Sequence, residues 1–209
     1  DKPAWITVGK GQNAQEAITS TSEGFAWLMV NATLPPPLAA WLRREILSIN
    51  QQHFAHRDDL ETRTAILPGL TTPEYPETSG VKLPATLALV CYHTPELCEL
   101  ASMLQTRLRK HGCELTISRK DREEWHTHNA LTQADLLLGD YLAGGLPGFA
   151  LAEWFTDEPA WATALGEDIW QKEKQKLMGY CGSEESLSNL LPSFFQSLLE
   201  SGACTPLFH

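Results

Sequence analysis

The strongest constraint on the fold is an alternation of strand and helix patterns between residues 85 and 138. Residues 85–91 are continuously apolar, as in a strand buried on both faces, and residues 113–118 alternate apolar and polar side chains. The helix predicted between these two strands has one apolar face: Leu97, Leu100, Ala101, Leu104 and Leu108. A capping-box spacing at residues 121–124 and an apolar strand at residues 134–138 follow. This order predicts an α/β fold with a mixed sheet flanked by helices.

Weaker patterns on both sides of this run predict the remaining elements. Strands are expected at residues 4–9, 24–31 and 203–209, and helices at residues 38–54, within 146–155, at 167–178 and at 183–201. The proline-rich residues 67–84 predict an extended surface excursion. If the chain forms a lobe inserted between two hinge strands, residues 4–9 and 203–208 should lie close together.

Composition limits the partners of the chain. Its 209 residues carry a net charge of −10 without clustered Lys or Arg, which argues against contact with nucleic acid. The chain also lacks an apolar run of the roughly 18–20 residues that span a membrane. From the chain length we expect residues 1–209 to form a single ligand-binding lobe. Because the sequence does not start with Met, we expect this lobe to belong to a longer protein.

The cysteines predict a reducing environment. The chain has 5 of them, without the spacing of a metal site, and Cys91, Cys113 and Cys204 lie in apolar, strand-like stretches. We therefore expect these thiols to be reduced and buried.

No group of residues predicts catalysis, a metal site or a cofactor. The histidine pairs at 53/56 and 126/128 lack an evident third ligand. Asp157 and Glu158 form an acidic pair, which we interpret as stabilising the start of a helix rather than as an acid–base pair. A non-enzymatic binding function is the expectation.

One segment is a candidate ligand site. Gly139, Asp140 and Tyr141 follow the predicted strand at residues 134–138 and precede a glycine-rich loop. In open α/β sheets, ligands bind in the crevice beyond the carboxyl ends of the strands. Asp140 could pair with a ligand cation or hydroxyl group, and for that role its carboxylate should be partly accessible and free of any Arg or Lys. The alternative is that Asp140 is a turn residue or helix cap and Tyr141 a rim residue.

The order of these elements resembles the second lobe of the type II periplasmic-binding-protein fold, in the branch of family 5 extracellular solute-binding proteins. The resemblance rests on the strand at 24–31 with its following helix, the proline-containing stretches at 64–69 and 73–76, and the run from 85 to 141. Asp140 and Tyr141 stand in the place of the family's Asp-Tyr element, although residues 142–147 replace the polar-Asp-Pro turn that follows it there.

A closer resemblance is to SgrR-type transcription regulators, whose return strand is similar to residues 203–209. The resemblance implies a cytoplasmic, ligand-sensing domain that works with a second lobe and a DNA-binding head elsewhere in the same polypeptide. It implies a small polar ligand such as a sugar phosphate, with a short peptide as the other class. The alternative is a lobe of an exported peptide- or sugar-binding protein of an ABC transporter, in the periplasm.

Overall fold

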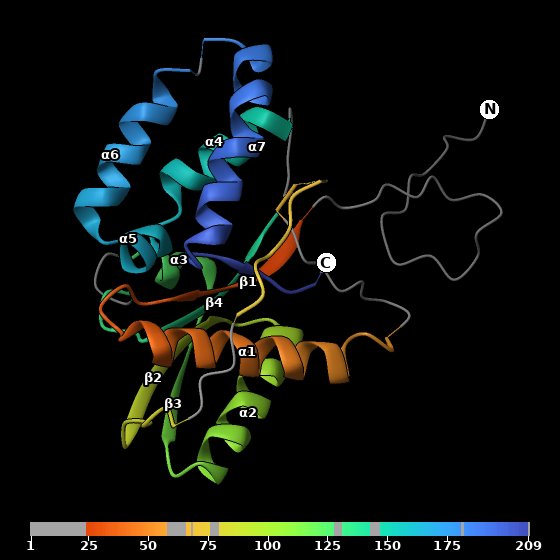
Figure 1. The fold of residues 1–209 in the computed structure, drawn as a ribbon, viewed down its shortest axis with the longest axis vertical. Coiled ribbons are helices and arrows are strands. Elements are labelled where there is room, and N and C mark those ends of the chain that lie inside the picture. The colour runs from red at the N-terminus through yellow and green to blue at the C-terminus, as the bar shows by residue number, and fades with distance from the viewer. Residues whose placement is uncertain are drawn as a thin grey trace, which may run out of the picture.

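The mixed sheet at the centre of the chain has five strands in the order β3-β2-β4-β1-β5 (Figure 1). The computed structural model describes residues 24–57, 66–67, 69–75, 80–127, 131–142, 147–180 and 182–208. The strands are β1 (Phe25–Val30), β2 (Thr86–Tyr92), β3 (Glu114–Lys120), β4 (Leu136–Tyr141) and β5 (Thr205–Pro206). The helices are α1 (Pro36–His53), α2 (Pro95–Lys110), α3 (Arg122–Trp125), α4 (Pro147–Asp157), α5 (Ala160–Leu165), α6 (Glu167–Met178) and α7 (Glu184–Glu200).

The strand directions place several strand ends at one edge of the sheet. β2 runs parallel to both β3 and β4, whereas β1 is antiparallel to β4 and to β5. The carboxyl ends of β2, β3 and β4 therefore point the same way. The predicted α/β fold with a mixed sheet flanked by helices is confirmed.

Helices cover both faces of the sheet. Figure 1 shows α1 and α2 together on one side and α4 to α7 grouped on the other. α1 forms because its apolar residues recur every three or four positions, and the side chains on that stripe are all buried: Leu38, Leu42, Ile46 and Ile49. Burial of such a side chain stabilises the fold by about 1.5–3 kcal/mol. Prolines at the start of α1 are tolerated because the first N–H groups of a helix have no partner within it.

An aromatic cluster fills the core between the sheet and α3, α4 and α5. Trp27 of β1 lies 6.0 Å from Trp125 and 6.3 Å from Trp154, measured between ring centroids. Gly139 of β4 makes room for this cluster. A Cβ atom at Gly139 would lie 2.3 Å from a ring carbon of Trp27, so any larger residue would collide with the indole.

The first and last described strands lie side by side. The N–H of Ala26 donates to the carbonyl of Phe208 at 2.7 Å, and the N–H of Leu207 donates to the carbonyl of Ala26 at 2.9 Å. The strand expected at residues 4–9 lies outside the described residues, so its predicted proximity to residues 203–208 stays a prediction. Within residues 67–84, the described positions form neither helix nor strand, as expected for an extended excursion.

The thiol prediction is confirmed for the three cysteines that it named. Cys91, Cys113 and Cys204 are free and buried.

Each helix in the described ranges is too short or too polar to cross a lipid bilayer.

Candidate functional site

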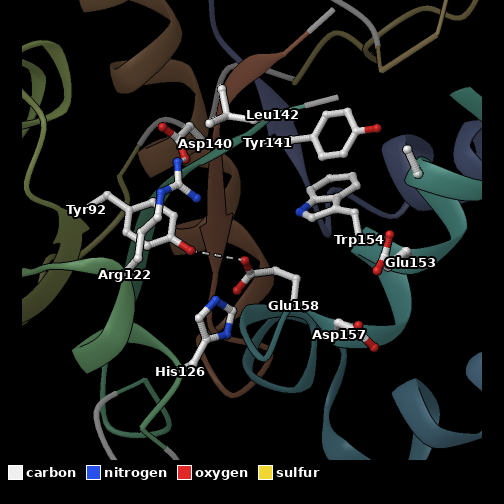
Figure 2. A pocket seen from close by; sticks show the side chains of 11 residues that line it. Tyr92, Arg122, His126, Asp140, Tyr141, Leu142, Glu153, Trp154, Asp157 and Glu158 are labelled. Carbon is white, nitrogen blue, oxygen red and sulfur yellow. Dashed lines mark hydrogen bonds and ion pairs between the residues drawn. The ribbon is translucent and has the colours of Figure 1, made fainter. Parts of the chain in front are cut away.

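A pocket of about 500 Å³ opens at the edge where the parallel strands end. Tyr92 is the last residue of β2, Arg122 begins the helix that follows β3, and Asp140 and Tyr141 end β4. Helix α4 and the residue after it form the facing wall (Figure 2). The lining residues are Tyr92, Arg122, His126, Asp140, Tyr141, Leu142, Ala150, Glu153, Trp154, Asp157 and Glu158. The site thus lies at the carboxyl edge of the sheet, where ligands bind in open α/β folds.

The structure brings two of the three predicted site residues into this pocket. Asp140 and Tyr141 both line it, although they belong to β4 itself rather than to a segment after the strand. Gly139 is absent from the lining, because it faces Trp27 in the aromatic core. Its contribution is to let β4 pack closely on that indole.

The expectation that the Asp140 carboxylate is free of a basic partner is wrong. Arg122 donates to Asp140 Oδ1 at 2.9 Å. The capping box of α3 explains the encounter, since the Asp121 side chain accepts from the N–H of Glu124 and fixes the start of the helix beside the end of β4. The other part of the expectation is confirmed, because the Asp140 side chain remains 20% exposed.

Burial and Arg122 act on Asp140 in opposite directions. Burial raises the pKa of the Asp140 carboxyl above its usual value, and the Arg122 guanidinium partly offsets that rise. Arg122 also lies over the ring of Tyr92, with its guanidinium carbon 5.2 Å from the ring centroid, as in a cation–π contact. A ligand group that approaches Asp140 therefore meets an arginine already in place.

Glu158 forms the floor of the pocket, and the sequence interpretation missed this role. Its carboxylate accepts hydrogen bonds from the indole N–H of Trp125 at 2.7 Å, from the N–H of Ala160 at 3.1 Å and from the Tyr92 hydroxyl at 3.4 Å. The bond to Ala160 fits the predicted helix-start role, since Ala160 begins α5. Burial raises the pKa of Glu158 to about 7, against the effect of these hydrogen bonds.

Helix α4 makes the opposite wall acidic and aromatic. Glu153 and Asp157 lie one helical turn apart and are exposed, with the buried Trp154 between them in sequence. Trp154 contacts Tyr141 across the pocket wall, with ring centroids 5.1 Å apart. Among the described residues that line the pocket, Arg122 is the only Lys or Arg, so carboxylates outnumber fixed cations.

Metal ligation has no support in the described part of the chain, where no cluster of three or more His, Cys, Asp or Glu residues could hold an ion. His128, one half of a histidine pair noted in the sequence, lies outside the described residues.

Solved structures of similar shape are family 5 solute-binding proteins. NikA from Brucella suis in complex with Fe(III)-EDTA matches 88% of this chain with 45% of its own, at a TM-score of 0.62 and 13% identity. NikA from Staphylococcus aureus in complex with Ni(L-His)2 matches 90% of this chain with 45% of its own, at a TM-score of 0.61 and 14% identity. The oligopeptide-binding protein AppA from Bacillus subtilis, in complex with a nonapeptide, matches 92% of this chain with 46% of its own, at a TM-score of 0.57 and 12% identity.

The chain therefore has the fold of one lobe of a type II periplasmic binding protein. A curated relative is the uncharacterized protein YbaE of Escherichia coli (strain K12), which is 33% identical over 219 aligned positions. That alignment includes 99% of this chain but only 38% of the relative, so the chain spans well under half of the protein it matches. No protein-family model matches the sequence.

Proposed function

We propose that this chain is the ligand-binding lobe of a solute-binding-like protein without enzymatic activity, and that the pocket of Asp140 and Tyr141 is its half of the ligand site. The observation that carries the proposal is the pocket at the carboxyl edge of a sheet with this lobe fold. A second lobe of the same polypeptide closes over the ligand, and contacts with both lobes favour the closed state. The length covered in the relatives supports this arrangement, since each matched chain extends well beyond the matched region.

The charges of the pocket favour a ligand with a positively charged group. Three carboxylates line the pocket: Asp140, Glu153 and Asp157. The only Lys or Arg among the described lining residues is Arg122, which is already paired with Asp140. Of the two ligand classes expected from the sequence, a short peptide with its ammonium group fits this lining better than a sugar phosphate. A sugar phosphate would have to use Arg122 as its anchor and displace it from Asp140.

We further propose that the complete protein is a cytoplasmic transcription regulator, in which closure of the two lobes is transmitted to a DNA-binding head. The support is the resemblance to SgrR-type regulators. An exported binding protein of an ABC transporter is the alternative, and the likeness in fold to the oligopeptide-binding protein AppA supports it. The sequence of the full-length protein separates the two: a helix-turn-helix segment supports the regulator, and a secretory signal peptide refutes it.

Asp140→Asn in the full-length protein tests the ligand site. We expect trialanine to raise the melting temperature of the wild type and to bind the variant at least about tenfold more weakly, because the variant loses the charge that pairs with the ligand ammonium. Stability should change by less than about 1 kcal/mol, since the Arg122 partner is 57% exposed and its ion pair is weak.

The matched control is Glu114→Gln, which removes a carboxylate paired with Arg109 at 3.2 Å on the surface outside the pocket. It should leave trialanine binding unchanged. Glucose 6-phosphate is the second probe. Tight binding of glucose 6-phosphate together with no response to trialanine would refute the peptide assignment. Equal trialanine affinity of wild type and Asp140→Asn would remove Asp140 from the site.

A further inference from the structure

A second cavity adjoins the candidate ligand pocket at the end of β4. It has a volume of about 180 Å³ and shares Asp140, Tyr141 and Leu142 with that pocket. The candidate ligand pocket is walled by α4, whereas the second cavity is bounded by the start of α2, which covers the opposite face of the sheet (Figure 1). The end of β4 therefore lies between the two cavities, and Asp140 lines both of them.

The walls of the second cavity are mainly apolar. Phe25, Leu97 and Phe208 line it from β1, from α2 and from the residues after β5, and each is no more than 5% exposed. Leu142 also lines it and is 60% exposed. A ligand group that covers this leucine removes apolar surface from water, which stabilises the bound state.

The charges around the second cavity disfavour an anion inside it. The ionisable side chains that could carry a negative charge there are those of Glu96 and Asp140, and none of the described lining residues is Lys or Arg. The positive end of the α2 dipole already has Glu96 in its first turn. A ligand carboxylate or phosphate would be repelled by both carboxylates, and a charged group would lose its water against apolar walls. The second cavity therefore suits an uncharged, apolar group.

The volume of the second cavity sets the size of that group. A cavity of about 150 Å³ lined by leucine, isoleucine and phenylalanine side chains is large enough to bind benzene. The 180 Å³ available here therefore has room for a phenyl ring or a branched aliphatic side chain. In a peptide, the first side chain is bonded to the carbon atom that carries the ammonium group. A peptide with its ammonium group at Asp140 thus has its first side chain next to this cavity.

We propose that the second cavity is a subsite for the N-terminal side chain of a peptide ligand, and that it selects peptides with a large apolar first residue. The inference rests on the proposed function, because it requires the ligand ammonium group at Asp140. It adds a side-chain preference that the charges of the candidate ligand pocket do not provide.

Three tripeptides test the proposal by isothermal titration calorimetry with the full-length wild-type protein. Phenylalanyl-alanyl-alanine carries the ring beside its ammonium group. Alanyl-alanyl-phenylalanine has the same atoms and charges with the ring at the other end, and trialanine has no ring. We expect phenylalanyl-alanyl-alanine to bind at least about tenfold more tightly than either of the others, the effect of burying one aromatic side chain.

A pair of variants tests the location of the subsite. Leu142→Ala removes an exposed apolar side chain from the lining. Met178→Ala is the matched control, because Met178 is 59% exposed and lines neither cavity. In Leu142→Ala, the affinity for phenylalanyl-alanyl-alanine relative to trialanine should fall at least about threefold. The control should keep the wild-type ratio. Because both peptides are measured on the same variant, this ratio does not depend on the fraction of folded protein.

The outcomes separate this inference from the proposed function. Equal affinities of the wild type for trialanine and phenylalanyl-alanyl-alanine overturn the inference alone. An isomer that binds as tightly as phenylalanyl-alanyl-alanine also overturns it, because the ring would then be recognised elsewhere. An unchanged ratio in Leu142→Ala removes the second cavity from this role. Failure of all three peptides to bind the wild type refutes the proposed function and the inference together.

Discussion

The buried carboxyl of Glu158 makes the stability of this fold depend on pH. The pKa of Glu158 rises from an ordinary value of 4.5 to about 7 because burial disfavours its charged form. The folded protein therefore holds a proton on Glu158 at pH values where the unfolded chain has released it. Stability from this carboxyl is fully present below about pH 4.5 and is lost as the pH rises to about 7.

The size of the effect follows from the two pKa values. Each pH unit between 4.5 and 7 contributes about 1.4 kcal/mol, so the loss amounts to about 3 kcal/mol. Glu158→Gln should abolish this component, because glutamine does not titrate. Its side-chain oxygen can still accept from Trp125 and Ala160, which preserves two of the three hydrogen bonds to this position.

Urea denaturation of wild type and Glu158→Gln between pH 4.5 and 8 tests this prediction by measuring their free energies of unfolding. The free energy of unfolding of Glu158→Gln, relative to wild type, should increase by about 3 kcal/mol from the acidic to the alkaline end of this range. Groups that do not interact with Glu158 titrate in the same way in both proteins, so their contributions cancel in the difference. Glu123→Gln, at an exposed position in α3, should follow the wild-type profile. Parallel pH profiles for wild type and Glu158→Gln would refute the assignment of a raised pKa to Glu158.

Two further predictions concern the core. Gly139→Ala should destabilise the fold by about 1–3 kcal/mol in urea titrations, because its Cβ would lie 2.3 Å from a Trp27 ring carbon. The Cβ of Gly182→Ala meets open space, so that variant should lose far less stability, and equal losses would contradict the packing argument. Burial raises the pKa of the Cys91 thiol to about 12 and also raises the pKa of the Cys204 thiol. A thiol reagent at pH 8 should therefore label both cysteines only after unfolding. Fast labelling of either cysteine in the folded protein would contradict this prediction.

The sequence was sufficient for elements with a strong periodic pattern. The apolar stripe of α2 and the cap at Gly112, whose φ is +77°, predicted that helix well, and residues 167–178 match α6. The short helix α5 (Ala160–Leu165) was not predicted, since six residues after a proline give too little periodic signal. Of the expected strand at residues 203–209, Thr205–Pro206 form β5, and Leu207 and Phe208 add backbone hydrogen bonds to Ala26 of β1.

The candidate site was predictable in place but not in composition. A strand end followed by a glycine-rich loop correctly indicated where Asp140 and Tyr141 would lie. Arg122, Trp154 and Glu158 reach the pocket from elements distant in sequence, and their convergence depends on strand order and helix packing. The capping box at residues 121–124 was a usable signal for Arg122, because it fixed the start of a helix at the edge where β4 also ends.

The ion pair between Arg122 and Asp140 is compatible with a ligand site for a physical reason. The Arg122 side chain is 57% exposed, and its guanidinium also lies over the Tyr92 ring, where it can stay when its bond to Asp140 breaks. An exposed pair of this kind contributes at most about 1 kcal/mol. A ligand ammonium group enclosed between two lobes would lose more water and interact more strongly with Asp140 than Arg122 does in the open lobe. Under the proposed function, Arg122 would neutralise Asp140 in the absence of ligand, and the interaction of Asp140 with a bound cation would offset the loss of this ion pair.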